Sequence, residues 1–149
     1  MSLRLAYWSA APDALKAMRG VGEYIKKSGL DHKLIELVYL RISQINGCAY
    51  CLDMHSAELR KLGEKQHRMD CVAGWRDAPF FTARERAALG WAESLTHVSA
   101  THAPDADYAP VKANFSEKEI ADLTFAIALM NAWNRISIGT GHGPKERHD

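Results

Sequence analysis

Hydrophobic residues recur every three or four positions along most of this chain, which is the spacing of one face of an α-helix. The stretch 12–28 is an example, because it carries Leu15, Met18, Val21 and Ile25. Alternation with a period of two, which is typical of a half-buried strand, is missing nearly everywhere, and short pieces such as 3–8 are the only strand candidates. The pattern predicts an all-α protein of six to eight helices, folded as a single domain over residues 1–149.

The expected breaks between helices fall at residues that cap or terminate helices. Gly29 ends the first helix, Asp31 caps the second, and Asn46-Gly47 separates the second from the third. Thr82-Ala-Arg-Glu85 and Ser116-Glu-Lys-Glu119 have the form of a capping box, in which two side chains satisfy otherwise unpaired backbone N–H groups. The expected helices cover 12–28, 32–44, 48–63, 64–73, 82–95, 105–113 and 116–139, with loops at 74–81 and 99–104.

Two of the expected helices, 32–44 and 116–139, are apolar on more than one face. A helix of this kind is buried in the core or between subunits. The longer one also carries Asn131 and Asn134, and buried amides need hydrogen-bond partners. We therefore expect these two asparagines to orient neighbouring helices or subunits.

Composition and charge exclude several classes of protein. The chain has 149 residues, 47% hydrophobic and 25% charged, as in an ordinary globular protein. A formal net charge of +1 attracts neither nucleic acid nor an anionic membrane, and no apolar run approaches the roughly 20 residues that span a bilayer. The N-terminus lacks the apolar stretch of a signal peptide, so we expect a cytoplasmic protein with no nucleic-acid or membrane partner.

Reactive side chains concentrate between residues 36 and 55. Cys48 and Cys51 are separated by two residues, so on a helix their thiols can approach each other. The unpaired N–H groups of a helix start stabilise a thiolate, which is the form that attacks peroxides and disulfides. His55 follows Cys51 by one helical turn, and Glu36 lies twelve residues before Cys48. An imidazole and a carboxyl group are suited to moving the protons that thiol chemistry requires.

A lone pair of cysteines at this spacing is shared by redox, zinc and haem-attachment sites. Haem of the c type needs a histidine directly after the second cysteine, where this chain has Leu52, so that class is excluded. Structural zinc needs four ligands, and only Cys71 and scattered histidines could complete the set. The residues alone favour redox chemistry and leave zinc binding or inert core cysteines open. Cys71 has no near partner and is expected to be a small core residue.

The segment from Glu36 to Gly63 resembles the core of the alkylhydroperoxidase D and carboxymuconolactone decarboxylase-like family. Its pattern is a glutamate, eleven residues, Cys-x-x-Cys, three residues and a histidine, and Glu36, Cys48, Cys51 and His55 fall on it. This motif covers about a fifth of the chain, and the run Asn131-Ala-Trp-Asn-Arg135 is also similar to the family. The resemblance implies an alkylhydroperoxidase D-like helical bundle that self-associates, often as a trimer or hexamer.

The resemblance also implies a thiol-dependent alkyl hydroperoxide reductase. In that mechanism Cys51 attacks the hydroperoxide and becomes a sulfenic acid, and Cys48 resolves it to a disulfide. Glu36 and His55 serve as a proton relay, and an external dithiol, either a small molecule or a protein adaptor, resets the pair. The substrate is a small hydroperoxide or disulfide, and we expect neither a cofactor nor a metal.

One departure concerns the residue between the cysteines. The alkylhydroperoxidase D branch carries an additional histidine there, whereas this chain has Tyr50. Tyrosine is a poor base near neutral pH, so we expect a simpler relay and a different peroxide or reductant. The alternatives are a non-redox enzyme like the decarboxylase branch, which does not depend on the cysteine pair, and a zinc-binding module without catalytic activity.

Overall fold

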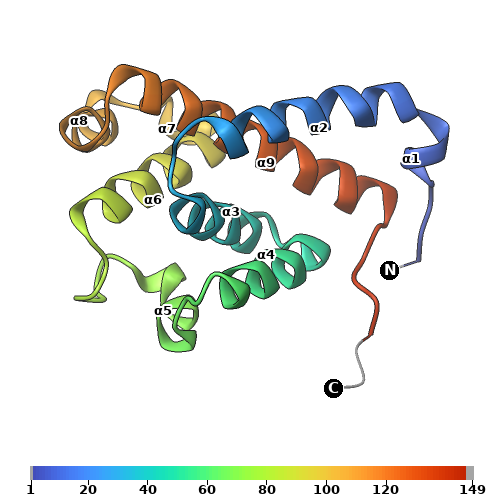
Figure 1. Cartoon of the computed structure of the whole chain (residues 1–149), viewed down its shortest axis with the longest axis horizontal. Helices are drawn as coiled ribbons and strands as arrows, with labels where there is room; N and C mark the ends of the chain where they lie inside the picture. Colours follow the sequence, from blue (N-terminus) through green and yellow to red (C-terminus); the bar gives the residue numbers. More distant parts are fainter. Residues whose placement is uncertain (1, 147–149) are drawn as a thin grey trace.

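The computed structural model describes residues 2–146, which form nine α-helices and one short 3₁₀-helix and contain no strand (Figure 1). The prediction of an all-α fold is confirmed. Two helices of four residues each raise the number above the expected six to eight. The helices are α1 (Tyr7–Ala10), α2 (Pro12–Lys27), α3 (His32–Asn46), α4 (Ala49–Lys61), α5 (Gln66–Asp70), η1 (Val72–Gly74), α6 (Ala83–Thr96), α7 (Val98–Thr101), α8 (Asp105–Asn114) and α9 (Glu117–Thr140).

The predicted capping residues form the caps. The carboxylate of Asp31 accepts the backbone N–H of Leu34 at 2.9 Å and opens α3. Both capping boxes form, with Thr82 at the start of α6 and Ser116 at the start of α9. Each cap satisfies N–H groups that the first turn of a helix leaves unpaired, which is typically worth about 1 kcal/mol.

Two local predictions were wrong, and the strand candidate 3–8 is not a strand. Residues 64–73 are not one helix but α5 followed by η1, and the expected loop 99–104 begins inside α7. The strand candidate 3–8 leads instead into α1, because the N–H groups of Arg4 and Leu5 both donate to the carbonyl oxygen of Thr140 rather than to a partner strand. The contact of Arg4 and Leu5 with Thr140 joins residues distant in the sequence, and local spacing does not record such contacts.

The α3 helix lies at the centre of the fold, packed against α4, α6 and α9. Val38 and Ile42 on one face join a cluster with Leu123 of α9, whereas Leu37 on the other face joins a second cluster with Leu59 of α4. All five side chains are fully buried or nearly so, each worth roughly 2 kcal/mol of hydrophobic stabilisation. The prediction that this helix is buried is confirmed.

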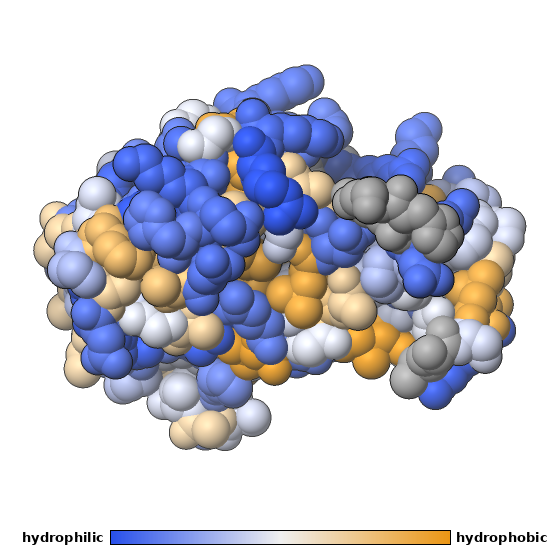
Figure 2. Space-filling view, turned by 90° about the horizontal axis from the view of Figure 1, so that it is seen from below, coloured by the Kyte–Doolittle hydropathy of each residue, from blue (hydrophilic) through white to orange (hydrophobic). Residues whose placement is uncertain are grey.

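The surface is mostly polar, with small separate hydrophobic areas on the face that Figure 2 shows. Large apolar side chains that remain exposed include Val21, Tyr24 and Phe125, the last with 62% of its surface exposed. Among the described residues, no helix combines the length and apolar character that crossing a bilayer requires.

The N-terminal segment lies against the C-terminal end of α9, where Figure 1 also shows α1. Gly141 has a φ of 73°, which is a conformation that favours glycine, and it ends α9. A Cβ atom at this position would collide with the carbonyl oxygen of Ser2. After this turn the chain runs back toward α4.

Candidate redox site

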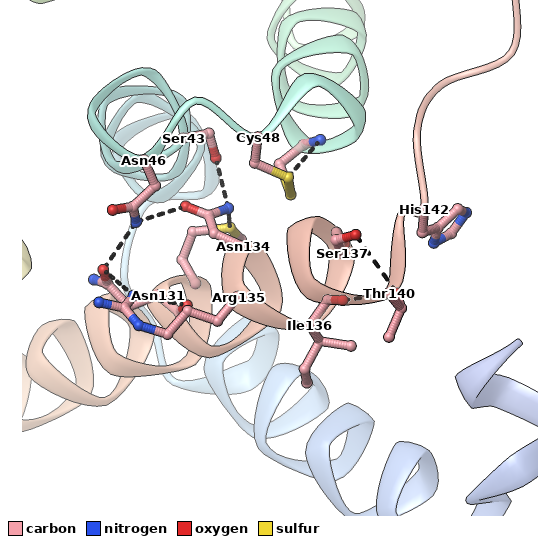
Figure 3. Close-up of a disulfide and its surroundings, with 12 residues drawn as sticks. Ser43, Asn46, Cys48, Asn131, Asn134, Arg135, Ile136, Ser137, Thr140 and His142 are labelled. Carbon is pink, nitrogen blue, oxygen red and sulfur yellow. Dashed lines mark hydrogen bonds between the residues drawn. A yellow bond between two sulfur atoms is a disulfide. The ribbon is translucent and has the colours of Figure 1, made fainter. Parts of the chain in front are cut away.

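A buried layer of amide and hydroxyl groups fixes the turn that precedes the cysteines (Figure 3). Asn134 of α9 donates to the hydroxyl of Ser43 at 3.2 Å and accepts from Asn46 at 2.9 Å. Asn46 also donates to the side-chain oxygen of Asn131 at 3.0 Å. The prediction that the two α9 asparagines orient helices is confirmed, because they hold the end of α3 against α9.

Gly47 then turns the chain so that Cys48 stands at the N-terminal cap of α4, as predicted. Gly47 has a φ of 69° and ends α3, and Cys48 is extended. The backbone N–H of Cys48 donates to the carbonyl oxygen of Ser43, and its sulfur accepts the N–H of Cys51 at 3.4 Å. The sulfur therefore sits among the unpaired N–H groups of a helix start, where a negative charge is stabilised.

Cys48 and Cys51 are joined in a disulfide, with their Cα atoms 5.3 Å apart. Each cysteine is only 1% exposed, but Cys51 lines a cavity and Cys48 is not among the lining residues. Cys71 is free and partly buried, packed against the second core cluster as expected of a core residue.

Glu36 and His55 form a pair in which the imidazole is buried and the carboxylate is partly exposed. Nδ1 of His55 lies 2.7 Å from Oε2 of Glu36, and a carboxylate can only accept, so Nδ1 carries the proton. In the neutral ring this leaves Nε2 bare, and that buried atom has no hydrogen-bond partner among the described residues. The ring also packs against Tyr39, whose pKa is raised by burial and by the charge of Glu36, so that tyrosine stays a neutral phenol. The free nitrogen is therefore placed to exchange a proton.

A cavity of about 450 Å³ connects these groups, within the size range of small-molecule sites. Glu36 from α3 and Cys51 and His55 from α4 line it. Residues of α2 also line it, and α9 contributes the apolar residues Leu129, Met130 and Trp133. Three of the four predicted site residues thus share one cavity, with the fourth, Cys48, bonded behind Cys51.

Sequence reasoning missed the contribution of α2 to this cavity. The α2 residues that line it form an inward stripe with helical spacing, and they are Leu15, Arg19, Gly22, Ile25 and Lys26. The spacing is visible in the sequence, but it indicates only that these residues share a face, not that the face borders the cysteines.

Sequence reasoning also missed the surroundings of Tyr50. Its ring packs against His142, with ring centroids 4.1 Å apart. The hydroxyl of Tyr7 lies 3.3 Å from Nδ1 of the same histidine. Burial and the neighbouring Tyr50 raise the pKa of Tyr7, and Arg19 partly opposes that rise. An imidazole thus does stand beside the residue between the cysteines, but it comes from the C-terminal segment.

The zinc alternative gains no support from the arrangement of ligands. Within residues 2–146, no group of three or more histidine, cysteine, aspartate or glutamate side chains is gathered in a way that could hold a metal ion.

Comparison with known proteins adds independent evidence. The profile of the carboxymuconolactone decarboxylase family matches residues 12–94, a stretch that includes all four predicted site residues. The uncharacterized protein YdfG of Bacillus subtilis (strain 168) is 38% identical over 142 residues, which cover 95% of this chain and 97% of that protein. The alkyl hydroperoxide reductase AhpD of Coxiella burnetii is 42% identical over 48 residues, or 32% of this chain and 27% of that enzyme.

A solved structure matches nearly the whole chain. ATU0492 of Agrobacterium tumefaciens, described as a protein of unknown function and as a candidate antioxidant defence protein AhpD, is 41% identical and superposes with a TM-score of 0.93. The match covers 97% of this chain and 100% of that one. The helical bundle described above therefore has the alkylhydroperoxidase D-like fold.

Proposed function

The chain belongs to the carboxymuconolactone decarboxylase family, and we propose that within this family it is a thiol-dependent hydroperoxide reductase. The observation that carries the proposal is that Cys51 shares a cavity with the Glu36–His55 pair while its sulfur is bonded to Cys48. A nucleophile, a base with an orienting carboxylate and a resolving thiol are the parts that this chemistry needs.

The proposed cycle starts from the reduced pair. The thiolate of Cys51 attacks the terminal oxygen of the hydroperoxide, the O–O bond breaks, and the alkoxide takes a proton to leave as an alcohol. Cys51 is now a sulfenic acid, oxidised by two electrons. The thiol of Cys48 attacks its sulfur, the S–O bond breaks, and hydroxide leaves as water with the proton from Cys48. The product is the disulfide.

Protons are proposed to move through His55. Its bare Nε2 accepts the proton of the Cys51 thiol and returns it to the departing alkoxide, while Glu36 holds the protonated Nδ1 and stabilises the imidazolium. Tyr39 packs against the ring and has a raised pKa, so it stays neutral and does not itself exchange a proton with His55. In this scheme Cys51, Cys48, His55 and Glu36 are the catalytic residues.

A dithiol donor completes the cycle by thiol–disulfide exchange, in which the donor is oxidised to its own disulfide as Cys48 and Cys51 regain two thiols. The donor is a small molecule or a protein adaptor. The proposal includes a cytoplasmic location, where thiols are kept reduced, and a homo-oligomer, either a trimer or a hexamer. It requires neither nucleic acid nor a membrane.

The deciding experiment measures consumption of an organic hydroperoxide with dithiothreitol as donor. Cys51→Ser is expected to abolish turnover, and Cys48→Ser to accumulate a Cys51 sulfenic acid that a dimedone-type reagent labels. Cys71→Ser is the matched control and should keep full activity. Turnover that survives in Cys51→Ser would eliminate the proposed nucleophile.

The same variants separate the alternatives. A non-redox, decarboxylase-like enzyme would keep its activity after both cysteines of the pair are replaced. A zinc module would hold stoichiometric metal as purified and unfold with a chelator.

A further inference from the structure

One wall of the cavity carries a positive charge that the proposed reaction does not use. Arg19 is one of the α2 residues that line this cavity together with Tyr50 and Cys51 of α4. Within a helix, residues four apart share a face, so Leu15 and Arg19 point the same way. The guanidinium group of Arg19 is thus part of the wall that a substrate approaching Cys51 meets.

Arg19 lines this cavity and has no ion-pair partner among residues 2–146. The other three charged side chains in the lining have partners: Glu36 with His55 (2.7 Å), Glu58 with Lys61 (3.2 Å) and Lys26 with Glu23 (3.4 Å). Within residues 2–146, no carboxylate forms an ion pair with Arg19. Among the described residues, Arg19 is therefore the Lys, Arg, Asp or Glu side chain of the lining without an ion-pair partner.

The neighbours of Arg19 suit an anion. Tyr7 and Tyr50 line the same cavity, and Tyr7 interacts electrostatically with both Tyr50 and Arg19, so these three groups gather at one end. The Tyr50 hydroxyl can donate a hydrogen bond beside the guanidinium group, whose planar donors match the two oxygens of a carboxylate. The hydroxyl of Tyr7 lies 3.3 Å from Nδ1 of His142. These groups provide donors for an anionic group close to the residue that precedes Cys51.

Much of the rest of the lining is apolar. Its apolar residues include Leu15, Ile25, Ile35, Leu129, Met130 and Trp133. A cavity of about 450 Å³ with such walls accepts a hydrocarbon or aromatic body rather than hydrogen peroxide alone.

We propose that the substrate is an amphipathic organic hydroperoxide that bears a carboxylate, and that Arg19 binds this carboxylate while the apolar walls hold the body and the peroxide group reaches Cys51. This inference rests on the proposed hydroperoxide reductase function and specifies its substrate class. Because Arg19 is largely solvent-exposed, its attraction for the carboxylate is screened by salt. Arg19 is a specificity-determining residue in this scheme and takes no part in the redox steps.

The test compares a charged and a neutral form of one hydroperoxide: cumene hydroperoxide with a carboxylate in the para position, and its methyl ester. The variants are Arg19→Gln, Arg19→Lys, and the matched control Lys16→Gln, which removes a charge from the same helix at an exposed position outside the cavity. Thermal unfolding establishes that all three remain folded.

We expect Arg19→Gln to lower kcat/KM for the carboxylate substrate about five-fold, through KM, and to leave the ester unchanged. Arg19→Lys should restore part of the loss, and Lys16→Gln should have no effect. Raising the salt concentration should increase KM for the carboxylate substrate in the unmodified protein but not in Arg19→Gln. An equal effect on both substrates, or an equal effect of Lys16→Gln, would overturn the assignment.

A binding measurement keeps the two proposals distinguishable. Calorimetry with 4-isopropylbenzoate, which has no peroxide group, should show weaker binding to Arg19→Gln than to the unmodified protein. If both hydroperoxides are reduced without preference and Arg19→Gln binds the benzoate equally well, the substrate assignment fails and the reductase function stands. If neither hydroperoxide is reduced but the benzoate binding depends on Arg19, the carboxylate site stands and the reductase function fails.

Discussion

Nδ1 of His55 lies 2.7 Å from Oε2 of Glu36, a contact that joins α4 to α3 one helical turn from Cys51. Because the carboxylate fixes the protonated nitrogen, it also fixes which nitrogen is free for exchange. The first prediction follows from this relationship.

Glu36→Gln is expected to lower kcat/KM for hydroperoxide about ten- to hundred-fold, as loss of a carboxylate that orients a functional histidine typically does. The amide retains the shape but not the charge that stabilises an imidazolium. Steady-state kinetics over a range of pH measures the effect. Glu58→Gln is the matched control, because Glu58 lines the same cavity but pairs with the exposed Lys61. A comparable loss in the control would contradict the special role of Glu36.

Asn134→Ala should lower the free energy of unfolding by more than the small size of the buried amide would suggest. Replacing it with alanine leaves the buried Ser43 hydroxyl without this partner and removes one of the two hydrogen bonds of the Asn46 amide, at a cost of roughly 2–3 kcal/mol in the free energy of unfolding. Urea unfolding measures this. Arg135→Ala changes the neighbouring, exposed residue of α9 and should alter stability by less than about 0.5 kcal/mol. Equal destabilisation by both changes would argue against the layer.

Glu93 should make the stability of the protein depend on pH. Burial opposes its ionisation, but hydrogen bonds from Arg76, Trp75 and Arg41 outweigh burial, so the pKa of Glu93 lies below its ordinary value of 4.5. The Glu93 carboxylate therefore binds a proton more readily in the unfolded chain than in the folded protein. Its contribution to the free energy of unfolding is fully present above pH 4.5 and is lost as the pH falls through the pKa of Glu93 in the folded protein.

Glu93→Gln should accordingly cost about 2 kcal/mol at neutral pH, the scale of hydrogen bonds to a charged group. The difference from the unmodified protein should shrink as the pH falls below 4.5. Urea unfolding at pH 7 and at several acidic values measures both numbers. A difference that stays constant across this range would show that the charge of Glu93 is not responsible.

His142 should protect the residue between the cysteines. His142→Ala removes the ring that packs on Tyr50, and we expect this to loosen the first turn of α4. Alkylation of Cys51 in the reduced protein by iodoacetamide should become about three-fold faster, since local opening controls access to a buried thiol. Peptide mapping by mass spectrometry follows the label. His97→Ala, at an exposed position on α6's C-terminal cap, should leave the rate unchanged.

Alanine substitutions at two glycines should distinguish the cost of a left-handed backbone conformation from the cost of a steric clash. Gly63 and Gly141 have φ values of 75° and 73°, but only Gly141 faces another backbone segment. Gly63→Ala should therefore cost about 1 kcal/mol for the left-handed conformation alone. Gly141→Ala should cost clearly more, because Ser2 must move as well. Urea unfolding of both variants checks this. An equal loss in the free energy of unfolding would mean that the N-terminal segment moves aside without a measurable cost.

Much of the fold could be predicted because its information is local. The spacing of Leu15 and Ile25 predicts a helix, and Thr82 and Ser116 predict where helices start, since caps involve residues three apart. The position of Cys48 at a helix start follows in the same way from the Asn46-Gly47 turn before it.

The rest of the site could not be read from spacing, because it depends on contacts across the fold. Glu36 and His55 are 19 residues apart, and their pairing was implied by a family resemblance rather than by periodicity. Nothing local indicates that Arg19 borders Cys51 or that His142 reaches Tyr50. The short helix α7 could not be read from spacing either. His102 ends it with a φ of 52°, which is unusual for a residue other than glycine.

The contact between the N-terminal segment and Gly141 has a practical consequence for purification of this protein. Ser2 lies against Gly141, and Tyr7, which lines the cavity, lies beside His142, so an affinity tag fused to the N-terminus begins within a few residues of the cavity lining. A polyhistidine tag there would add imidazoles, and any nickel they retain, to the segment that carries Tyr7. Assays of peroxide turnover should therefore be run after the tag has been cleaved, with the tagged form beside it as a comparison.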